Sequence, residues 1–207
     1  MRVFGWNGAS WSQFGDAIYD ESPEQYGYFG SSAVLSADGS TLVVGHPSAD
    51  SDNGTSTGRV RTYRWDGTSW VAKGSATYAV IEGAAQGDQV GLGPSSSQGD
   101  RLALSADGSR LIIGEPYYDS PNGSNSGRAK VYYWNGSGWR PLGNEMYGAY
   151  SGYELGASVA FSRDGSKVVI GGTGGGTNNS FFKNGYVFRV QSLGSKSFRL
   201  RNWGFRA

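Results

Sequence analysis

Six side chains that could contact a ligand lie just after two short apolar runs of the sequence. The runs are Leu42–Val44 and Leu111–Ile113, and each is followed by glycine, one of the six side chains and proline. The six residues are His46, Asp50, Asp52, Glu115, Tyr117 and Tyr118. Imidazole, carboxylate and phenol groups exchange hydrogen bonds and protons, and loops that follow buried strands commonly carry binding residues. We expect these six to be ligand contacts, although His46 and Glu115 occupy a position that varies between the runs, as an unconstrained loop position also does.

Oxygen ligands are clustered in the segment 50–54, which reads Asp-Ser-Asp-Asn-Gly and resembles a calcium loop in composition. A turn in which the Asp and Asn side chains bond their own backbone explains the same composition. The equivalent segments later in the chain are less acidic, with Asp119, Asn122 and Asn125 in one and Asn178 and Asn179 in the other. Because calcium takes about six to eight oxygen ligands, we expect no metal or cofactor, with calcium at residues 50–54 as the alternative.

Composition excludes several classes of chemistry. The 207 residues include no cysteine and one histidine, so cysteine nucleophiles, disulfides and the usual cysteine or paired-histidine metal sites are absent. The 18 basic and 17 acidic residues are scattered, which indicates no nucleic-acid partner. No apolar run is long enough to cross a bilayer, and the chain as given has no signal peptide, so we expect no membrane insertion. Neither a G-x-S-x-G elbow nor a phosphate loop occurs, and we expect the chain not to be an enzyme.

Two short motifs recur along the chain in the same order. The first is Asp-Gly between two β-rich runs, with its glycines at residues 39, 108 and 165. The second is Trp-x-Gly-x-x-Trp, which spans residues 6–11, 65–70 and 134–139. Both motifs predict β-hairpins, because a tight turn between such runs requires positive φ. The six tryptophans suit stacking on sugars, but their recurrence in every hairpin favours cross-strand packing.

Hairpins in this order predict an all-β chain of β-propeller blades, each with four antiparallel strands A to D. We divide the chain into the C–D hairpin of a partial blade (1–25) and three blades (26–83, 84–148 and 149–207), about three and a half blades in all. In the last blade we expect residues 186–190 to pair with residues 197–201. Because propellers have about four to eight blades, the uncovered flanks predict self-association or a place in a larger chain or assembly.

The first full unit resembles an FG-GAP repeat of the integrin α-subunit propeller. The resemblance rests on Phe29-Gly30 and Gly45-His46-Pro47, with counterparts in Gly114-Glu115-Pro116 and Leu155-Gly156. The tryptophan hairpin is similar to repeat arrays in large secreted or surface proteins of marine microbes and algae. The resemblance implies an extracellular or cell-surface location and a surface that binds proteins or glycans. The family's calcium loops carry several carboxylates at the A–B turn, so calcium is not expected at the lone aspartates there, Asp38, Asp107 and Asp164.

Four asparagines in expected loops fit the N-glycosylation pattern: Asn53, Asn122, Asn135 and Asn178. Such matches also arise by chance in a chain rich in serine and glycine. They agree with a secreted protein, and we take them as candidate glycosylation sites.

From the sequence we expect a non-catalytic extracellular module of the adhesion type, in which rigid blades display loops to a protein or glycan ligand. Two alternatives stay open. A lectin would bind one sugar per blade through repeated aromatic and Asn/Asp loops. A propeller-fold glycoside hydrolase would use two carboxylates on one end face, a pair that the sequence does not place.

Overall fold

The computed structural model describes residues 1–20, 28–74, 80–93 and 100–173, together with the backbone of four short strands beyond residue 173. Strands are the only regular elements of these described residues. They are β1 (Phe4–Trp6), β2 (Trp11–Gln13), β3 (Ala33–Leu35), β4 (Thr41–His46), β5 (Arg59–Trp65), β6 (Trp70–Ala72), β7 (Val80–Glu82), β8 (Leu102–Leu104), β9 (Arg110–Glu115), β10 (Arg128–Trp134), β11 (Trp139–Pro141), β12 (Met146–Tyr147), β13 (Ser158–Phe161), β14 (Lys167–Gly171), β15 (Gly185–Arg189), β16 (Ser192–Leu193), β17 (Ser197–Phe198) and β18 (Asn202–Trp203).

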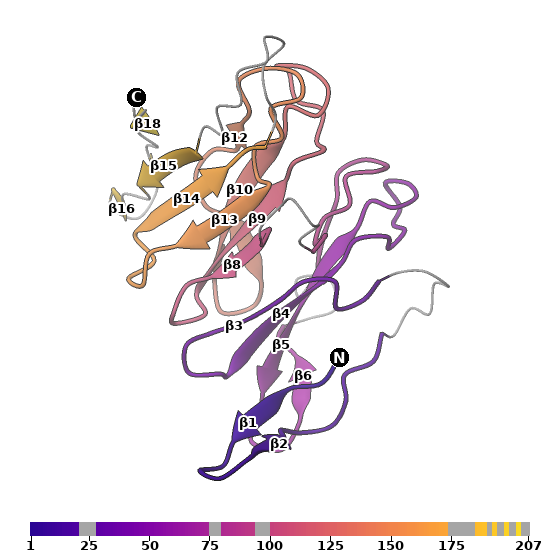
Figure 1. Cartoon of the computed structure of the whole chain (residues 1–207), viewed down its shortest axis with the longest axis vertical. Coiled ribbons are helices and arrows are strands. Elements are labelled where there is room, and N and C mark those ends of the chain that lie inside the picture. Colours follow the sequence, from indigo (N-terminus) through magenta and orange to yellow (C-terminus); the bar gives the residue numbers. More distant parts are fainter. Residues whose placement is uncertain are drawn as a thin grey trace.

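Three antiparallel sheets follow one another along the chain, and the β1–β2 hairpin precedes them (Figure 1). The first sheet has the order β3-β4-β5-β6, the second β8-β9-β10-β11 and the third β13-β14-β15-β18. The all-β class and the succession of antiparallel sheets are therefore confirmed. The number of blades and their boundaries stay predictions.

The outer edge of the sheets differs from the prediction of one strand D. In the first sheet β6 pairs with the end of β5, while β7 pairs with its beginning. β11 and β12 divide the edge of β10 in the same way. The predicted pairing of 186–190 with 197–201 is wrong, because Ser197–Phe198 turns back onto Ser192–Leu193 and Asn202–Trp203 takes the place beside β15.

The Asp-Gly turns have the same construction in all three sheets. Gly39, Gly108 and Gly165 lie at φ of 69°, 67° and 64°. In the first turn the Asp38 carboxylate accepts hydrogen bonds from the Ser36 hydroxyl and from the N–H and hydroxyl of Ser40. These bonds, the one from Ser36 foremost, lower the pKa of Asp38 to about 2. Each A–B turn thus uses its single carboxylate to hold its own backbone.

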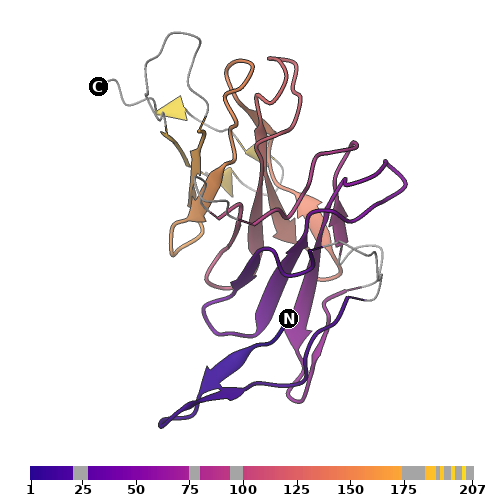
Figure 2. The ribbon, with the colours of Figure 1, turned by 45° about the vertical axis from the view of Figure 1, so that its right-hand side comes forward.

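Alternation along the second strand of each sheet builds the core between the sheets. Leu42 and Val44 of β4 pack toward the β1–β2 hairpin, whereas Val43 between them packs toward the second sheet. In β9 the neighbours Leu111 and Ile113 face the first sheet, and Ile112 faces the third. Each sheet is therefore covered on both faces wherever it has two neighbours, as Figure 2 shows for the second.

Close backbone contact at each junction requires glycine. A Cβ atom on Gly45 would lie 2.0 Å from the Gly91 carbonyl oxygen, and one on Gly114 would lie 2.0 Å from that of Gly156. Gly91 and Gly156 precede the first strand of the following sheet, so a glycine near the end of β4 or β9 meets a glycine at the entry to the next sheet. No larger residue fits without moving the sheets apart.

The paired tryptophans pack within and between sheets. Trp65 and Trp70 lie in register with their ring centroids 5.6 Å apart, and Trp134 and Trp139 repeat the arrangement at 5.4 Å. The Trp139 Nε1 donates to the Thr62 hydroxyl of the first sheet at 2.8 Å. In these two hairpins the packing interpretation of the motif agrees with the geometry.

Candidate functional site

The candidate site, which we call the Arg128 cluster, comprises Asp88, Glu115, Tyr118, Arg128, Lys130, Glu145 and Tyr147. It forms where β9 ends and β10 begins. Arg128 lies opposite Glu115 in the antiparallel register, and Lys130 points to the same face because side chains alternate along a strand. These positions bring two cations to one buried carboxylate.

Glu115 is the buried centre of the cluster. Its Oε2 accepts hydrogen bonds from Arg128 Nε at 2.8 Å and from Arg128 Nη2 at 2.6 Å, while Oε1 lies 2.8 Å from Lys130 Nζ. Burial would lower the pKa of Arg128 and of Lys130, but the charge of Glu115 outweighs it and both values are raised. Arg128 and Lys130 therefore keep their positive charges across the physiological range.

Aromatic rings and a second carboxylate form the outer side of the cluster. The Arg128 guanidinium carbon lies 3.4 Å from the centre of the Tyr118 ring, and Tyr147 stacks on Tyr118 with an interplanar angle of 19°. The Tyr147 hydroxyl donates to Glu145 Oε2 at 2.7 Å, and Arg128 Nη1 donates to the same oxygen at 3.3 Å. Glu145 and Tyr147 are exposed, so this side is open to a ligand.

Asp88 joins the cluster from the segment that leads into the second sheet. Its Oδ2 accepts hydrogen bonds from the backbone N–H groups of Ala84 and Ala85 at 2.9 and 3.0 Å and lies 3.7 Å from Arg128 Nη2. Three carboxylates, Asp88, Glu115 and Glu145, thus surround one guanidinium.

The environments of Asp88 and Glu145 shift their pKa values in opposite directions. Burial raises the pKa of Asp88, and the charge of Glu115 raises it further, against the backbone donors and Arg128. For Glu145, burial alone would raise the pKa, but the Tyr147 hydrogen bond and the charges of Arg128 and Lys130 together lower it. Asp88, which retains its proton more readily, and Glu145, which ionises more readily, thus lie on either side of Arg128. Acid–base catalysis uses two carboxyl groups whose pKa values are separated in this way.

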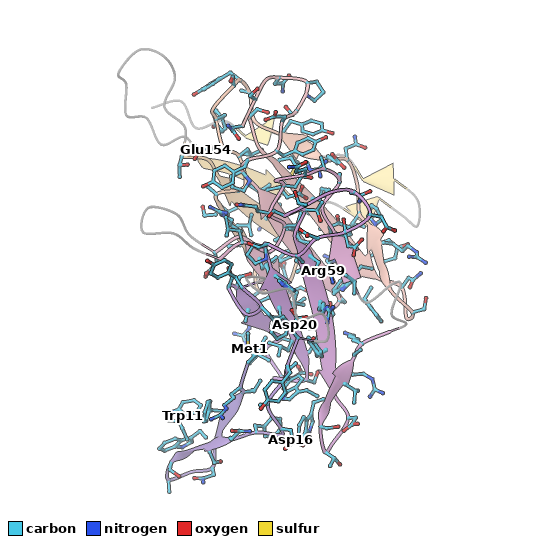
Figure 3. All side chains as sticks on the ribbon, turned by 90° about the vertical axis from the view of Figure 1, so that its right-hand side faces the viewer. Met1, Trp11, Asp16, Asp20, Arg59 and Glu154 are labelled. Atoms are coloured by element: carbon cyan, nitrogen blue, oxygen red, sulfur yellow. The ribbon has the colours of Figure 1, made fainter. Side chains whose placement is uncertain are left out.

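The equivalent place in the first sheet has a different charge pattern. His46 ends β4 opposite Arg59, and its side chain is fully buried. The carboxylate at this place is that of Asp20. Its Oδ2 lies 3.2 Å from His46 Nδ1, and its Oδ1 lies 3.4 Å from Arg61 Nη1. Figure 3 labels Asp20 and Arg59. The carboxylate therefore comes from the preceding segment in this sheet and from the strand itself in the second.

Of the first two sheets, only the second carries the aromatic pair Tyr118 and Tyr147. Ala49 stands where the second sheet has Tyr118, and Glu82, opposite Arg59, stands where it has Tyr147 opposite Arg128. The repeated loops therefore do not carry a repeated aromatic site.

Two of the six predicted ligand contacts, Glu115 and Tyr118, meet in the Arg128 cluster. Tyr117 lies apart from them, with its ring 5.2 Å from the guanidinium carbon of Arg101. Asp50 Oδ1 accepts a hydrogen bond from the Ser56 backbone at 2.8 Å, and Asp52 is exposed in the same loop. Ligand contact by the six residues stays a prediction.

Sequence reasoning missed five members of the cluster: Asp88, Arg128, Lys130, Glu145 and Tyr147. A usable signal was present for two of them. The basic pair Arg128 and Lys130 repeats Arg59 and Arg61 at the start of each third strand, opposite Glu115 and His46. Asp88 and Glu145 come from connections whose position no periodicity fixes.

The loop 50–54, considered for calcium, repeats its hydrogen bonds in the second sheet. Asp119 Oδ1 accepts from the Asn125 backbone at 2.7 Å, as Asp50 does from Ser56. Within the described parts of the chain, no three His, Cys, Asp or Glu side chains are grouped so as to hold a metal ion. Asp50 thus holds the backbone of its own loop, and calcium at residues 50–54 stays an untested alternative.

Three of the candidate glycosylation sites lie on exposed turns. Asn53 Nδ2 donates to the Gly83 carbonyl and Asn122 Nδ2 to that of Gly148, both at 2.8 Å, whereas Asn135 uses its Oδ1 to hold its own turn. Asn135 therefore leaves its Nδ2, the atom that a glycan would occupy, free of these sheet contacts. Asn178 lies outside the described residues.

The likeness of this chain to known proteins is one of structure. No family model matches the sequence, and no curated protein matches it. Among solved structures, the periplasmic gluconolactonase of Pseudomonas aeruginosa matches at 15% identity and a TM-score of 0.38, with 98% of this chain and 62% of that chain covered. The chain thus spans less than two thirds of that enzyme's length. In the described residues no helix could cross a membrane.

The comparison corrects two expectations from the sequence. We expected a non-catalytic adhesion module and expected the chain not to be an enzyme, but the matched structure is that of an enzyme. At this TM-score the likeness assigns no activity to the chain.

Proposed function

We propose that the chain is a propeller-type hydrolase that acts on a carbohydrate substrate at the Arg128 cluster. One observation carries the proposal: Asp88 and Glu145 lie on either side of Arg128, and their pKa values are shifted apart. Hydrolysis of a glycosidic bond requires one carboxyl that delivers a proton and one carboxylate that acts as nucleophile or base. This cluster holds both kinds of group.

Five members of the cluster have a direct role in this proposal. Asp88, with its raised pKa, is the general acid, and the ionised, exposed Glu145 is the nucleophile or base. The Arg128 guanidinium stabilises negative charge beside both carboxyls. The rings of Tyr118 and Tyr147 offer flat apolar surfaces of the kind on which sugar rings stack.

Turnover of a panel of aryl glycosides and sugar lactones tests the proposal. We expect at least one substrate to be hydrolysed, and we expect Glu145→Gln and Asp88→Asn each to lower kcat by at least about a hundredfold, the scale of a lost acid or base. Asp16→Asn removes an exposed carboxylate outside the cluster and serves as the control. A folded protein without turnover on the entire panel would refute the proposal.

The lectin alternative predicts one sugar per sheet, and the aromatic pair does not support it because the first sheet has Ala49 and Glu82 at the matching positions. Binding of several equivalent sugars per chain, measured by calorimetry, would favour the lectin instead. We further propose a relation to FG-GAP repeats, which the Phe29-Gly30 and Gly45-His46-Pro47 motifs support, and with it an extracellular location. Glycan attached at Asn135 in a secreted preparation would support that location.

A further inference from the structure

The two ends of the row of sheets expose positions that are buried everywhere between them. We define the start face as Phe4 and Trp11 on the β1–β2 hairpin, and the end face as the side of β13 and β14 that carries Val169. Figures 1 and 2 show the hairpin at one end of the row and the third sheet at the other. Figure 3 shows Trp11 projecting from the hairpin, away from the other sheets.

The residues of the start face lack the cover that their counterparts in the first and second sheets have. Trp70 and Trp139 are 9% and 5% exposed, whereas Trp11, at the same position of the motif, is 69% exposed. Phe4 is exposed as well, although its counterparts Tyr63 and Tyr132 are buried. The hairpin therefore presents the residues that the first and second sheets bury against the unit before them.

The end face shows the matching difference. Val43 and Ile112 are 0% exposed because each packs against the following sheet, whereas Val169 at the same position of the third sheet is 46% exposed. The third sheet thus leaves open the surface with which the first two sheets hold their successors.

The junctions inside the chain show how two such faces fit. Val43 packs in one cluster with Leu111, Ile113 and Trp139 of the next sheet. The indole N–H of Trp139 donates to the Thr62 hydroxyl on the third strand of the preceding sheet. The indole N–H of Trp70 donates to the backbone carbonyl of Phe14, just after β2, at 3.1 Å. In both junctions the later unit contributes the tryptophan, and the earlier unit contributes the acceptor.

We propose that the start face of one copy of this chain packs on the end face of a second copy and thereby continues the internal junction between chains. Trp11 takes the place of Trp139, and Val169 takes that of Val43. The contact is head-to-tail, so it uses two different faces and leaves one of each open until a ring closes. A head-to-tail contact repeated with the same rotation either closes a ring or continues as an open filament, and we expect the ring, a discrete multimer.

Light scattering on the 207-residue chain measures the mass of the particle in solution and so tests the proposal directly. We expect a discrete mass at a whole multiple of 22.0 kDa, and we expect Trp11→Glu and Val169→Glu each to reduce it to the monomer. Both side chains are exposed within one chain, so the variants should keep the far-UV circular dichroism of the parent. Ser12→Glu, on the neighbouring exposed position of the same strand, is the control and should leave the mass unchanged.

Mixing the two variants distinguishes head-to-tail contact from other arrangements. The Trp11→Glu copy keeps its end face and the Val169→Glu copy keeps its start face, so an equimolar mixture should form a heterodimer through one native junction. A monomeric parent chain would overturn the proposal and assign both faces to further segments of a longer protein. A multimer that survives Val169→Glu would also overturn it, because contact between two start faces does not need Val169.

Discussion

The side chains of Arg128 and Glu115 are joined at 2.6 Å in the interior, directly across two antiparallel strands. Each side chain is almost fully buried, so neither charge has water as a substitute partner. The pair links the end of β9 to the beginning of β10, next to the turns that carry the exposed carboxylate of the proposed site. Stability and site geometry therefore depend on the same contact.

Replacing Glu115 with glutamine should destabilise the chain strongly. Removal of one partner leaves Arg128 and Lys130 buried without their carboxylate, and broken buried pairs of this kind lower the free energy of unfolding by about 3–5 kcal/mol. Urea unfolding followed by tryptophan fluorescence measures the change. Asp52→Asn, in an exposed loop, should leave the midpoint unchanged. A loss below about 1 kcal/mol in Glu115→Gln, the range of surface pairs, would contradict a buried network.

The hydrogen bond between Trp139 and Thr62 should contribute a measurable coupling free energy between the first and second sheets. Thr62→Val leaves the buried indole N–H without its acceptor, which costs about 1–3 kcal/mol, whereas Thr62→Val combined with Trp139→Phe removes both partners. We expect the double variant to lose less free energy of unfolding than the two single variants lose together. A double-mutant cycle by urea unfolding gives the coupling energy, and simple additivity would show that the two residues act independently.

Local motifs predicted the turns and the tryptophan pairs because each depends on a few adjacent residues. Asp-Gly specifies a tight turn wherever it lies between β-rich runs, and Trp65 and Trp70 face each other once the turn between them closes. The same regularity located Glu115 at the end of a strand. The divided outer edge of the sheets gave no such signal, because β7 and β12 are too short to show a period.

The candidate site was harder to predict, since its carboxyls come from the connections. Asp88 reaches Arg128 from the segment between two sheets, and Asp20 reaches His46 in the corresponding way. Only the folded arrangement of successive sheets brings these segments over the strand ends. The burial of Glu115 could not be read from the sequence either, because an exposed loop residue and a buried ion pair look alike at that position.

Substituting Gly45 with alanine should disrupt the junction between the first and second sheets. The added methyl group would meet the Gly91 carbonyl oxygen at 2.0 Å, and overpacking of this kind lowers the free energy of unfolding by about 1–3 kcal/mol. Gly5→Ala is the matched control, because its Cβ would meet Phe14 at an ordinary 3.7 Å and it also lies in a strand. Thermal unfolding should separate the two variants clearly, and equal melting temperatures would refute close contact at the junction.

The aspartates of the A–B turns should make the chain sensitive to acid. The folded pKa of Asp38, about 2, lies below its ordinary value of 3.8, so the ionised turn stabilises the fold above pH 3.8 and this contribution is lost as the pH falls toward 2. Asp107 and Asp164 are shifted in the same direction. Asp38→Asn should therefore flatten the decline in the urea midpoint between pH 4 and pH 2. Curves that fall in parallel for both proteins would contradict this role.

The two carboxyls beside Arg128 should give the proposed hydrolase a bell-shaped pH profile. Activity falls on the acid side as Glu145 takes up a proton, and the lowered pKa of Glu145 moves that limb to lower pH. Activity falls on the alkaline side as Asp88 loses its proton, and its raised pKa moves that limb to higher pH, which broadens the optimum between them. In Tyr147→Phe the hydrogen bond to Glu145 is lost, so the acid limb should shift upward while the alkaline limb stays in place. Measurement of kcat/KM against pH for the parent and this variant tests the assignment, and a shift of the alkaline limb instead would exchange the roles of the two carboxyls.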